Sequence, residues 1–249
     1  MFFEIGGVNM KSFSITDIGE KRNINQDYVF CEENTIGGLP NLFIVADGMG
    51  GHNAGDYASK FCVEVFTKKI RENQQKTPIG MISDALQNTN DLLLEEAREN
   101  NGLQGMGTTF VATTIIDTVM YVANIGDSRL YVIGDGIKQI TEDHSLVEEM
   151  VKTGELDRKD MRDHPNKNII TRALGANKTV IPDYFEVNLV KDDTVLLCSD
   201  GLTNMMDDNE IMNIIREYPD NLEIAAKTLV EKANENGGKD NISIVIVKL

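Results

Sequence analysis

Four aspartates lie in short segments of one kind, each with the aspartate beside glycine or asparagine and next to an apolar, strand-like run. The segments are LFIVADGMGGH with Asp47, YVANIGDSR with Asp127, TVLLCSDGL with Asp200 and GGKDNISIVIV with Asp240. Aspartates at strand ends can project from a rigid scaffold toward one point, and neighbouring glycines let backbone carbonyls approach a ligand. Carboxylates without clustered histidine or cysteine are hard oxygen ligands, which favours Mg²⁺ or Mn²⁺ over Zn²⁺.

A turn is the alternative interpretation for each segment taken alone, because Asp-Gly is common turn chemistry. Four such segments, spread over nearly 200 residues, favour a shared site. Their spacing leaves open whether the side chains converge.

The elements that must position these aspartates follow from the spacing of the apolar residues. Runs rich in Val, Ile, Thr and Tyr predict strands at 11–16, 27–32, 42–46, 108–116, 119–125, 129–133, 180–188, 194–198 and 242–248. Three- and four-residue spacing predicts helices at 54–72, 79–100, 145–152, 208–216 and 222–234. The strands between 108 and 133 suggest an antiparallel meander. Strand runs interrupted by paired helices indicate an α+β fold.

The composition is that of a globular protein and excludes several classes. Of 249 residues, 41% are hydrophobic and 26% are charged, and 24 Lys and Arg against 40 Asp and Glu give a net charge of −16. This acidic balance argues against nucleic-acid binding. The sequence shows neither a membrane-spanning apolar run nor a secretory signal, and its three cysteines form no CxxC pair. We therefore expect a cytoplasmic protein without membrane partners and, since no segment is linker-like, one domain over residues 1–249.

An ordered set of segments resembles a known family. The segments are DIG at 17–19 with Arg22 and NQD at 25–27, VADGMGGH at 45–52, GTT at 107–109, NIGDSR at 124–129, TEDHS at 141–145, SDG at 199–201 and DNIS at 240–243. The chain is similar to the metal-dependent protein serine/threonine phosphatases (the PPM, or type 2C, family) in their bacterial form, over residues 12–247.

The resemblance implies a fold and a set of metal ligands. The fold is a four-layer α-β-β-α sandwich of two antiparallel sheets flanked by helix pairs, with the metals at one end between the sheets. Asp47 resembles the carboxylate that bridges two metal ions, with the Gly48 carbonyl completing the first site. Asp200 and Asp240 resemble ligands of the second ion. Asp127, with Asp200, resembles the pair that holds a third, weaker ion.

The resemblance also implies hydrolysis of phosphoserine and phosphothreonine in proteins. Arg22 is similar to the phosphate-binding guanidinium, and Asp27 to the residue that orients metal-bound water. Two Mn²⁺ or Mg²⁺ ions can share a water, lower its pKa and present hydroxide for in-line attack on phosphorus. No phosphoenzyme is then expected.

Two positions depart from the family pattern. Gln26 stands where many members have glutamate, so any water-mediated metal contact there would be neutral. Met49 stands where eukaryotic members have a histidine proposed as general acid, and a thioether cannot donate a proton. His52 follows three residues later, and a structural role is the expectation for it. The acid that protonates the leaving alkoxide is left unassigned.

Residues 146–170 align with the flap beside the active site of bacterial relatives. Its basic residues are candidates for contacting the phosphoprotein substrate: Lys152, Arg158, Lys159, Arg162 and Lys167. By family analogy a Ser/Thr kinase is the expected functional opponent, and a monomer is expected. Two alternatives stay open, a non-catalytic phosphoprotein-binding module of the same fold and a hydrolase of small phosphoesters.

Overall fold

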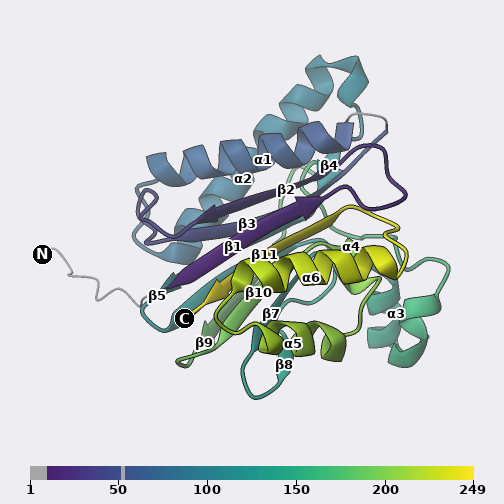
Figure 1. The fold of residues 1–249 in the computed structure, drawn as a ribbon. Coiled ribbons are helices and arrows are strands. Elements are labelled where there is room, and N and C mark those ends of the chain that lie inside the picture. Colours follow the sequence, from purple (N-terminus) through teal and green to yellow (C-terminus); the bar gives the residue numbers. More distant parts are fainter. Residues whose placement is uncertain (1–9, 52–53) are drawn as a thin grey trace, which may run out of the picture.

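The computed structural model describes residues 10–51 and 54–249, which form two antiparallel sheets stacked face to face (Figure 1). The first sheet has the order β1-β11-β10-β7-β8, with bounds Lys11–Asp17, Ile242–Lys248, Thr194–Cys198, Arg129–Ile133 and Ile137–Gln139. The second has the order β2-β3-β5-β6-β9, with bounds Asp27–Glu32, Leu42–Met49, Phe110–Ile116, Val119–Ile125 and Asp183–Asn188. A short strand, β4 (Gly107–Thr108), pairs with β3.

Each sheet is covered on its outer face by its own helices (Figure 1). The second sheet carries α1 (Ala54–Glu72) and α2 (Pro78–Glu99), and the first carries α4 (Asp200–Thr203), α5 (Asp208–Glu217) and α6 (Leu222–Glu235). Between β8 and β9 the chain forms α3 (Leu146–Thr153), which packs with the 3₁₀ helix η2 (Arg158–Asp163). A shorter 3₁₀ helix, η1 (Asn101–Leu103), follows α2. None of the helices in the described ranges has the length and apolar character that a membrane span requires.

Local sequence explains where these helices begin. The Thr77 side chain accepts a hydrogen bond from the Gly80 N–H, and Pro78 then opens α2 with its φ already fixed near the helical value. At α5, Asp207 and Glu210 form a reciprocal capping box. These caps satisfy amides that a helix end would otherwise leave unpaired.

The core has three apolar layers, one between the sheets and one between each sheet and its helices. Strands buried on both faces supply alternate residues to two layers, since successive side chains point to opposite faces. In β11, for example, Val245 and Val247 enter the layer between the sheets while Ile244 and Ile246 face the helices. The expected four-layer α+β sandwich is confirmed, while a single domain over residues 1–249 stays a prediction.

The expected meander from 108 to 133 is wrong at its last strand. β5 and β6 pair as a hairpin, but β7 lies in the other sheet beside β10. The chain leaves the second sheet at Gly126, whose φ of 105° is a conformation that side-chain-bearing residues rarely adopt. The sequence also missed β8 and α4, which are too short for their periodicity to show. The strand expected over 180–188 begins only at Asp183.

Candidate metal centre

One pocket of about 280 Å³ brings together the aspartates of all four segments. Its lining includes Asp47, Asp127, Asp200 and Asp240, together with Arg22, Gln26, Gly48, Met49, Gly50, Thr109, Asn168, Ile170 and Asn241. The strand registers explain the convergence, because the end of β1 lies opposite the start of β11, and the start of β2 lies opposite the end of β3. The acidic segments therefore meet at one end of the sandwich.

Asp47 lies inside β3 rather than after its end, directly across from Asp27 in β2. Its main chain is held on both sides, since the Asp47 N–H donates to Thr109 Oγ1 (2.9 Å) and its carbonyl accepts from the Thr109 N–H (2.8 Å). The next residue must be glycine, because a Cβ on Gly48 would lie 1.9 Å from the carbonyl oxygen of Gly55 in α1. The close approach of α1 thus shapes this wall of the pocket.

Asp127 is held by the turn that carries the chain between the sheets. The Gly126 N–H donates to His144 Nδ1 (3.1 Å), and the His144 N–H donates back to the Gly126 carbonyl (2.9 Å). Ser128 is fully buried, and its Oγ shares a hydrogen bond with Thr109 Oγ1 (2.7 Å). His144 and Ser128 are therefore structural supports of the Asp127 turn.

Neighbouring donors bind one carboxylate oxygen of Asp200 and both carboxylate oxygens of Asp240. Asn204 Nδ2 donates to Asp200 Oδ2 (2.8 Å), whereas Asp200 Oδ1 is buried and has no hydrogen-bond partner among the described residues. Arg22 Nη2 donates to Asp240 Oδ2 at 2.6 Å, and the main-chain N–H of Asn241 donates to Asp240 Oδ1. An orphaned buried carboxylate oxygen is costly in a protein interior, and a bound cation would satisfy it.

The electrostatics of the pocket also favour a cation. Burial raises the pKa values of Asp47 and Asp127 well above the ordinary range, and repulsion from the neighbouring carboxylates raises them further. Burial, with repulsion from Asp240, raises the pKa of Asp200 to about 6. The hydrogen bond to Asp240 is the main reason that the pKa of Arg22 is raised. Divalent ions would remove the repulsion that disfavours the ionised carboxylates.

The residues present fit divalent metal ions, although no three acidic, histidine or cysteine side chains in residues 10–51 and 54–249 are close enough to form a ready-made ligand set. The donors are oxygen atoms, which suit Mg²⁺ or Mn²⁺. Arg22 and Asn204 donate hydrogen bonds to carboxylate oxygens of Asp240 and Asp200, and a cation would compete for these oxygens.

The stability of the metal-free protein should depend on pH in a predictable direction. Asp27 and Asp200 have raised pKa values, so the folded protein keeps protons on them that the unfolded chain releases near pH 4. Their contribution to the free energy of unfolding is therefore complete below pH 4. It is lost as the pH rises through 6 to 7. In EDTA we expect the melting temperature to fall by roughly 5–10 °C between pH 5 and pH 7.5. Added Mn²⁺ should raise it more at pH 7.5 than at pH 5.

Differential scanning calorimetry at both pH values, with EDTA and with Mn²⁺, tests this dependence. The matched control is Asp200→Asn, which removes one of the titrating groups and should weaken the pH dependence measured in EDTA. An equal Mn²⁺ effect at pH 5 and pH 7.5 in the unsubstituted protein would contradict the prediction.

The other predicted residues fall into three groups. Arg22, Gln26 and Met49 line the pocket, whereas Asp27 lies buried beside it, across from Asp47. His52 lies outside the described residues. Asn168 and Ile170 also line the pocket, although they belong to none of the sequence motifs. They belong to the flap-like segment, residues 146–170. The expected position of that segment beside the active site is the feature of the sequence that could have identified them.

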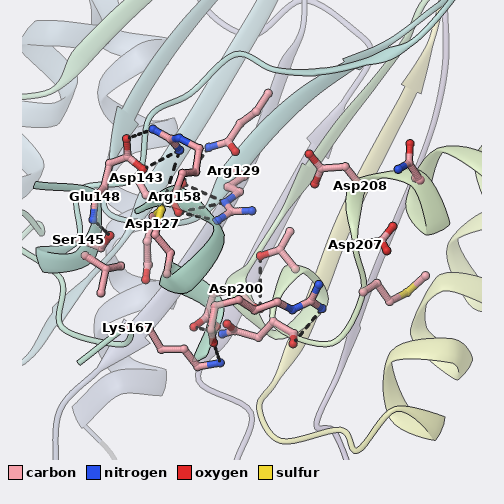
Figure 2. Close-up of a pocket in the computed structure, with 18 residues that line it drawn as sticks. Asp127, Arg129, Asp143, Ser145, Glu148, Arg158, Lys167, Asp200, Asp207 and Asp208 are labelled. Atoms are coloured by element: carbon pink, nitrogen blue, oxygen red, sulfur yellow. Dashed lines mark hydrogen bonds and ion pairs between the residues drawn. The ribbon is translucent and has the colours of Figure 1, made fainter. Parts of the chain in front are cut away.

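A second cavity of about 470 Å³ adjoins the first, and Asp127 and Asp200 contribute to the lining of both (Figure 2). Its other walls come from β7, β8, α3, η2, the end of α4 and the start of α5. Two ion pairs stabilise one side: Arg129 Nη2 lies 2.7 Å from Asp143 Oδ2, and Arg158 Nη2 lies 2.7 Å from Glu148 Oε1. The cavity extends from the acidic centre toward the flap-like segment.

Comparisons with known proteins agree with this fold. A model of the family described as protein phosphatase 2C matches residues 22–242. The chain is 41% identical over 238 residues to the serine/threonine phosphatase stp of Listeria innocua, covering 94% of this chain and 93% of that protein. A crystal structure of a bacterial serine phosphatase superposes with a TM-score of 0.89 at 34% identity, covering 96% of this chain and 98% of the other.

A further structure, the catalytic domain of the serine/threonine protein phosphatase PstP, contains two manganese ions. It superposes with a TM-score of 0.83 at 27% identity, covering 96% of this chain and 97% of that one. The fold and these relatives define a protein serine/threonine phosphatase. The chain belongs to the protein phosphatase 2C family.

Proposed function

We propose that this phosphatase hydrolyses phosphoserine and phosphothreonine in proteins with two divalent ions, Mn²⁺ or Mg²⁺. Asp47, the Gly48 carbonyl, Asp200 and Asp240 would hold the two ions, and Asp127 with Asp200 would hold a third, weaker one. The observation that carries the proposal is the single pocket shared by the four aspartates, in which Asp200 Oδ1 is buried without a partner. When bound, such ions supply an activated water for in-line attack without a phosphoenzyme.

Arg22 is the residue proposed to bind the phosphoryl group. Its side chain is 47% exposed at the pocket wall, where a phosphoprotein can reach it. The bond to Asp240 uses one of five N–H donors, so the planar guanidinium keeps donors for phosphate oxygens. Its positive charge would also offset the charge of the equatorial oxygens during transfer.

Asp27 is the residue proposed to orient the attacking water. Burial raises the pKa of Asp27 to about 7, although the hydrogen bond from the Ser199 hydroxyl opposes the rise. Bound divalent ions would offset the repulsion from Asp200 and Asp240 and favour the ionised carboxylate, which can accept hydrogen bonds from a water molecule. Asp27 Oδ1 is buried and has no hydrogen-bond partner among the described residues, so it is available for this contact.

Phosphate release from a phosphothreonine peptide, with Mn²⁺, with Mg²⁺ and with EDTA, tests the proposed function. We expect activity with either ion and none in EDTA. Binding of the phosphopeptide without hydrolysis would instead favour a non-catalytic binding module. A kcat/KM for p-nitrophenyl phosphate above that for the phosphopeptide would favour a hydrolase of small phosphoesters.

The flap-like segment offers a test of substrate contact. Of its basic residues, Arg158, Arg162 and Lys167 line the larger cavity, and Arg158 is paired with Glu148. Replacing Arg162 and Lys167 together by methionine should raise KM for the phosphopeptide roughly fivefold to tenfold with kcat nearly unchanged, because exposed charges contribute modestly to binding. Steady-state kinetics measures KM and kcat separately.

The matched control is Lys159→Met, which removes an exposed positive charge of the same segment outside the cavity. Its KM should stay within about twofold of the unsubstituted value. Equal KM values for the double variant and the control would contradict substrate contact by the flap. The opposing kinase, the monomeric state and the cytoplasmic location stay predictions from the sequence.

A further inference from the structure

The side chain of Ser199 places a buried hydroxyl beside the acidic pocket. Ser199 is fully buried, lies directly before Asp200 and occupies the N-cap position of α4. A serine at this position ordinarily caps the helix with its side chain, but within the described chain Ser199 Oγ makes no such bond. Its hydroxyl is engaged elsewhere.

The hydrogen bonds of Ser199 determine which way its hydroxyl donates. The Ser243 N–H donates to Ser199 Oγ (2.9 Å), so the oxygen is already an acceptor. The hydroxyl hydrogen is left for Asp27 Oδ2 at 2.7 Å, since the other acceptor in reach, the Asn241 carbonyl, lies at 3.4 Å. Short bonds from a hydroxyl to a carboxylate are among the stronger hydrogen bonds in proteins.

This hydroxyl joins the two sheets where the metal ligands meet. Ser243 lies in β11 of the first sheet and Ser199 directly follows β10, and the Ser199 N–H also donates to the Ser243 carbonyl (3.0 Å). Asp27 opens β2 in the second sheet, directly across from Asp47. The residue before Asp200 is therefore bound to the residue opposite Asp47.

The same bond sets the orientation of Asp27. A carboxylate group is planar, so a hydrogen bond to Oδ2 also determines where Oδ1 lies. Oδ1 is the buried oxygen that lacks a hydrogen-bond partner among the described residues. Without the hydroxyl, the side chain could rotate, and both oxygens would lose their defined positions.

We propose that Ser199 is a positioning residue, which holds Asp27 by Oδ2 so that Oδ1 faces the attacking water, and which keeps the two ligand-bearing sheets in register. This inference rests on the proposed function, in which Asp27 orients that water. Ser199 itself touches neither the substrate nor the reacting atoms. It acts through Asp27.

The first experiment compares kcat, KM and the Mn²⁺-induced rise in melting temperature. Ser199→Ala should lower kcat for a phosphothreonine peptide about tenfold, because one hydrogen bond to a charged group is lost, with KM within about twofold. The Mn²⁺ effect on melting should remain, since no ligand is removed. Ser199→Thr retains the hydroxyl and should restore kcat to within about threefold.

A matched control removes another fully buried hydroxyl far from the site. Thr89 in α2 donates only to the Ala85 carbonyl of its own helix, so Thr89→Val should leave kcat unchanged. An unchanged kcat in Ser199→Ala, or a Ser199→Thr variant as slow as Ser199→Ala, would overturn the inference. Should Ser199→Ala fail to fold by circular dichroism, Ser199→Cys replaces it; its weaker donor should lower kcat about threefold, and full activity would overturn the inference.

A double-mutant cycle separates positioning from general stability. If Ser199 acts through Asp27, adding Ser199→Ala to Asp27→Asn should cost no further activity, because the residue being positioned is already impaired. Effects that multiply would show that Ser199 acts independently and would overturn the inference. If the unsubstituted protein has no metal-dependent activity, the proposed function fails; if it is active and insensitive to Ser199→Ala, only the inference fails.

Discussion

Asp47→Asn is expected to lower kcat/KM for a phosphothreonine peptide by about a thousandfold or more, at any Mn²⁺ concentration. The amide keeps the shape of the side chain but cannot supply the anionic oxygens that divalent ions require. The main chain of Asp47 is held by Thr109 on both its N–H and its carbonyl, so the fold around the site should persist.

The same substitution should stabilise the metal-free protein. Burial and neighbouring carboxylates raise the pKa of Asp47 well above the ordinary range, which means that its ionised form costs stability at neutral pH. A neutral amide removes that cost. In EDTA at pH 7.5 we therefore expect a higher melting temperature for Asp47→Asn than for the unsubstituted protein, together with the loss of activity.

Phosphate release and thermal melting, measured on the same preparations, test both parts. The control is Asp91→Asn at an exposed position of α2, where the side chain accepts a hydrogen bond from Gln87 that an amide oxygen can also accept. Its kcat/KM should stay within about twofold. Retained activity in Asp47→Asn, or a melting temperature lowered together with activity, would contradict the assignment of Asp47 as a metal ligand.

The types of residue at the centre could be predicted from the sequence because short motifs carry local chemistry. Acidic residues beside glycine and strand-like runs were sufficient to identify Asp47, Asp127, Asp200 and Asp240, and the pocket contains all four. Most strands were also predictable, since β-branched and aromatic residues cluster within them. The resemblance to a family then supplied the fold that the spacing alone did not determine.

What the sequence could not reveal depends on contacts between distant segments. The bond from Ser199 to Asp27 joins residues 172 positions apart, and that from Arg22 to Asp240 joins residues 218 apart. The passage of the chain from one sheet to the other at Gly126 depends on the packing of both sheets. Local periodicity reports which face of an element is buried, but not which element covers it.

Arg22 illustrates this limit. It lies beside Asp240, where it would compete with a metal ion for the carboxylate, and no sequence motif predicts this contact. Arg22 Nη2 lies 2.6 Å from Asp240 Oδ2, so the proposed phosphate ligand is bound to a proposed metal ligand. Both side chains are partly exposed, and the exposed pair contributes little to stability by itself. A metal ion bound to Asp240 would take the place of Arg22, and a phosphoryl group bound to Arg22 would take the place of Asp240.

Arg22→Ala should therefore separate phosphate binding from metal binding. We expect kcat/KM for the phosphothreonine peptide to fall about a hundredfold, since charge-assisted hydrogen bonds to the phosphoryl oxygens are lost. Arg22→Lys should recover only part of the activity, because a lysine ammonium cannot make the bidentate contact. Affinity for Mn²⁺ should stay the same or increase, because Asp240 loses its competing cation.

Steady-state kinetics and Mn²⁺ titration by isothermal calorimetry measure the two effects in the same variants. Arg98→Ala, at an exposed position in the last turn of α2, removes an arginine of equal charge and should change neither quantity. Weaker Mn²⁺ binding in Arg22→Ala would mean that Arg22 supports the metal centre and does not compete with it. Full recovery by lysine would mean that charge alone, without the planar fork, accounts for phosphate binding.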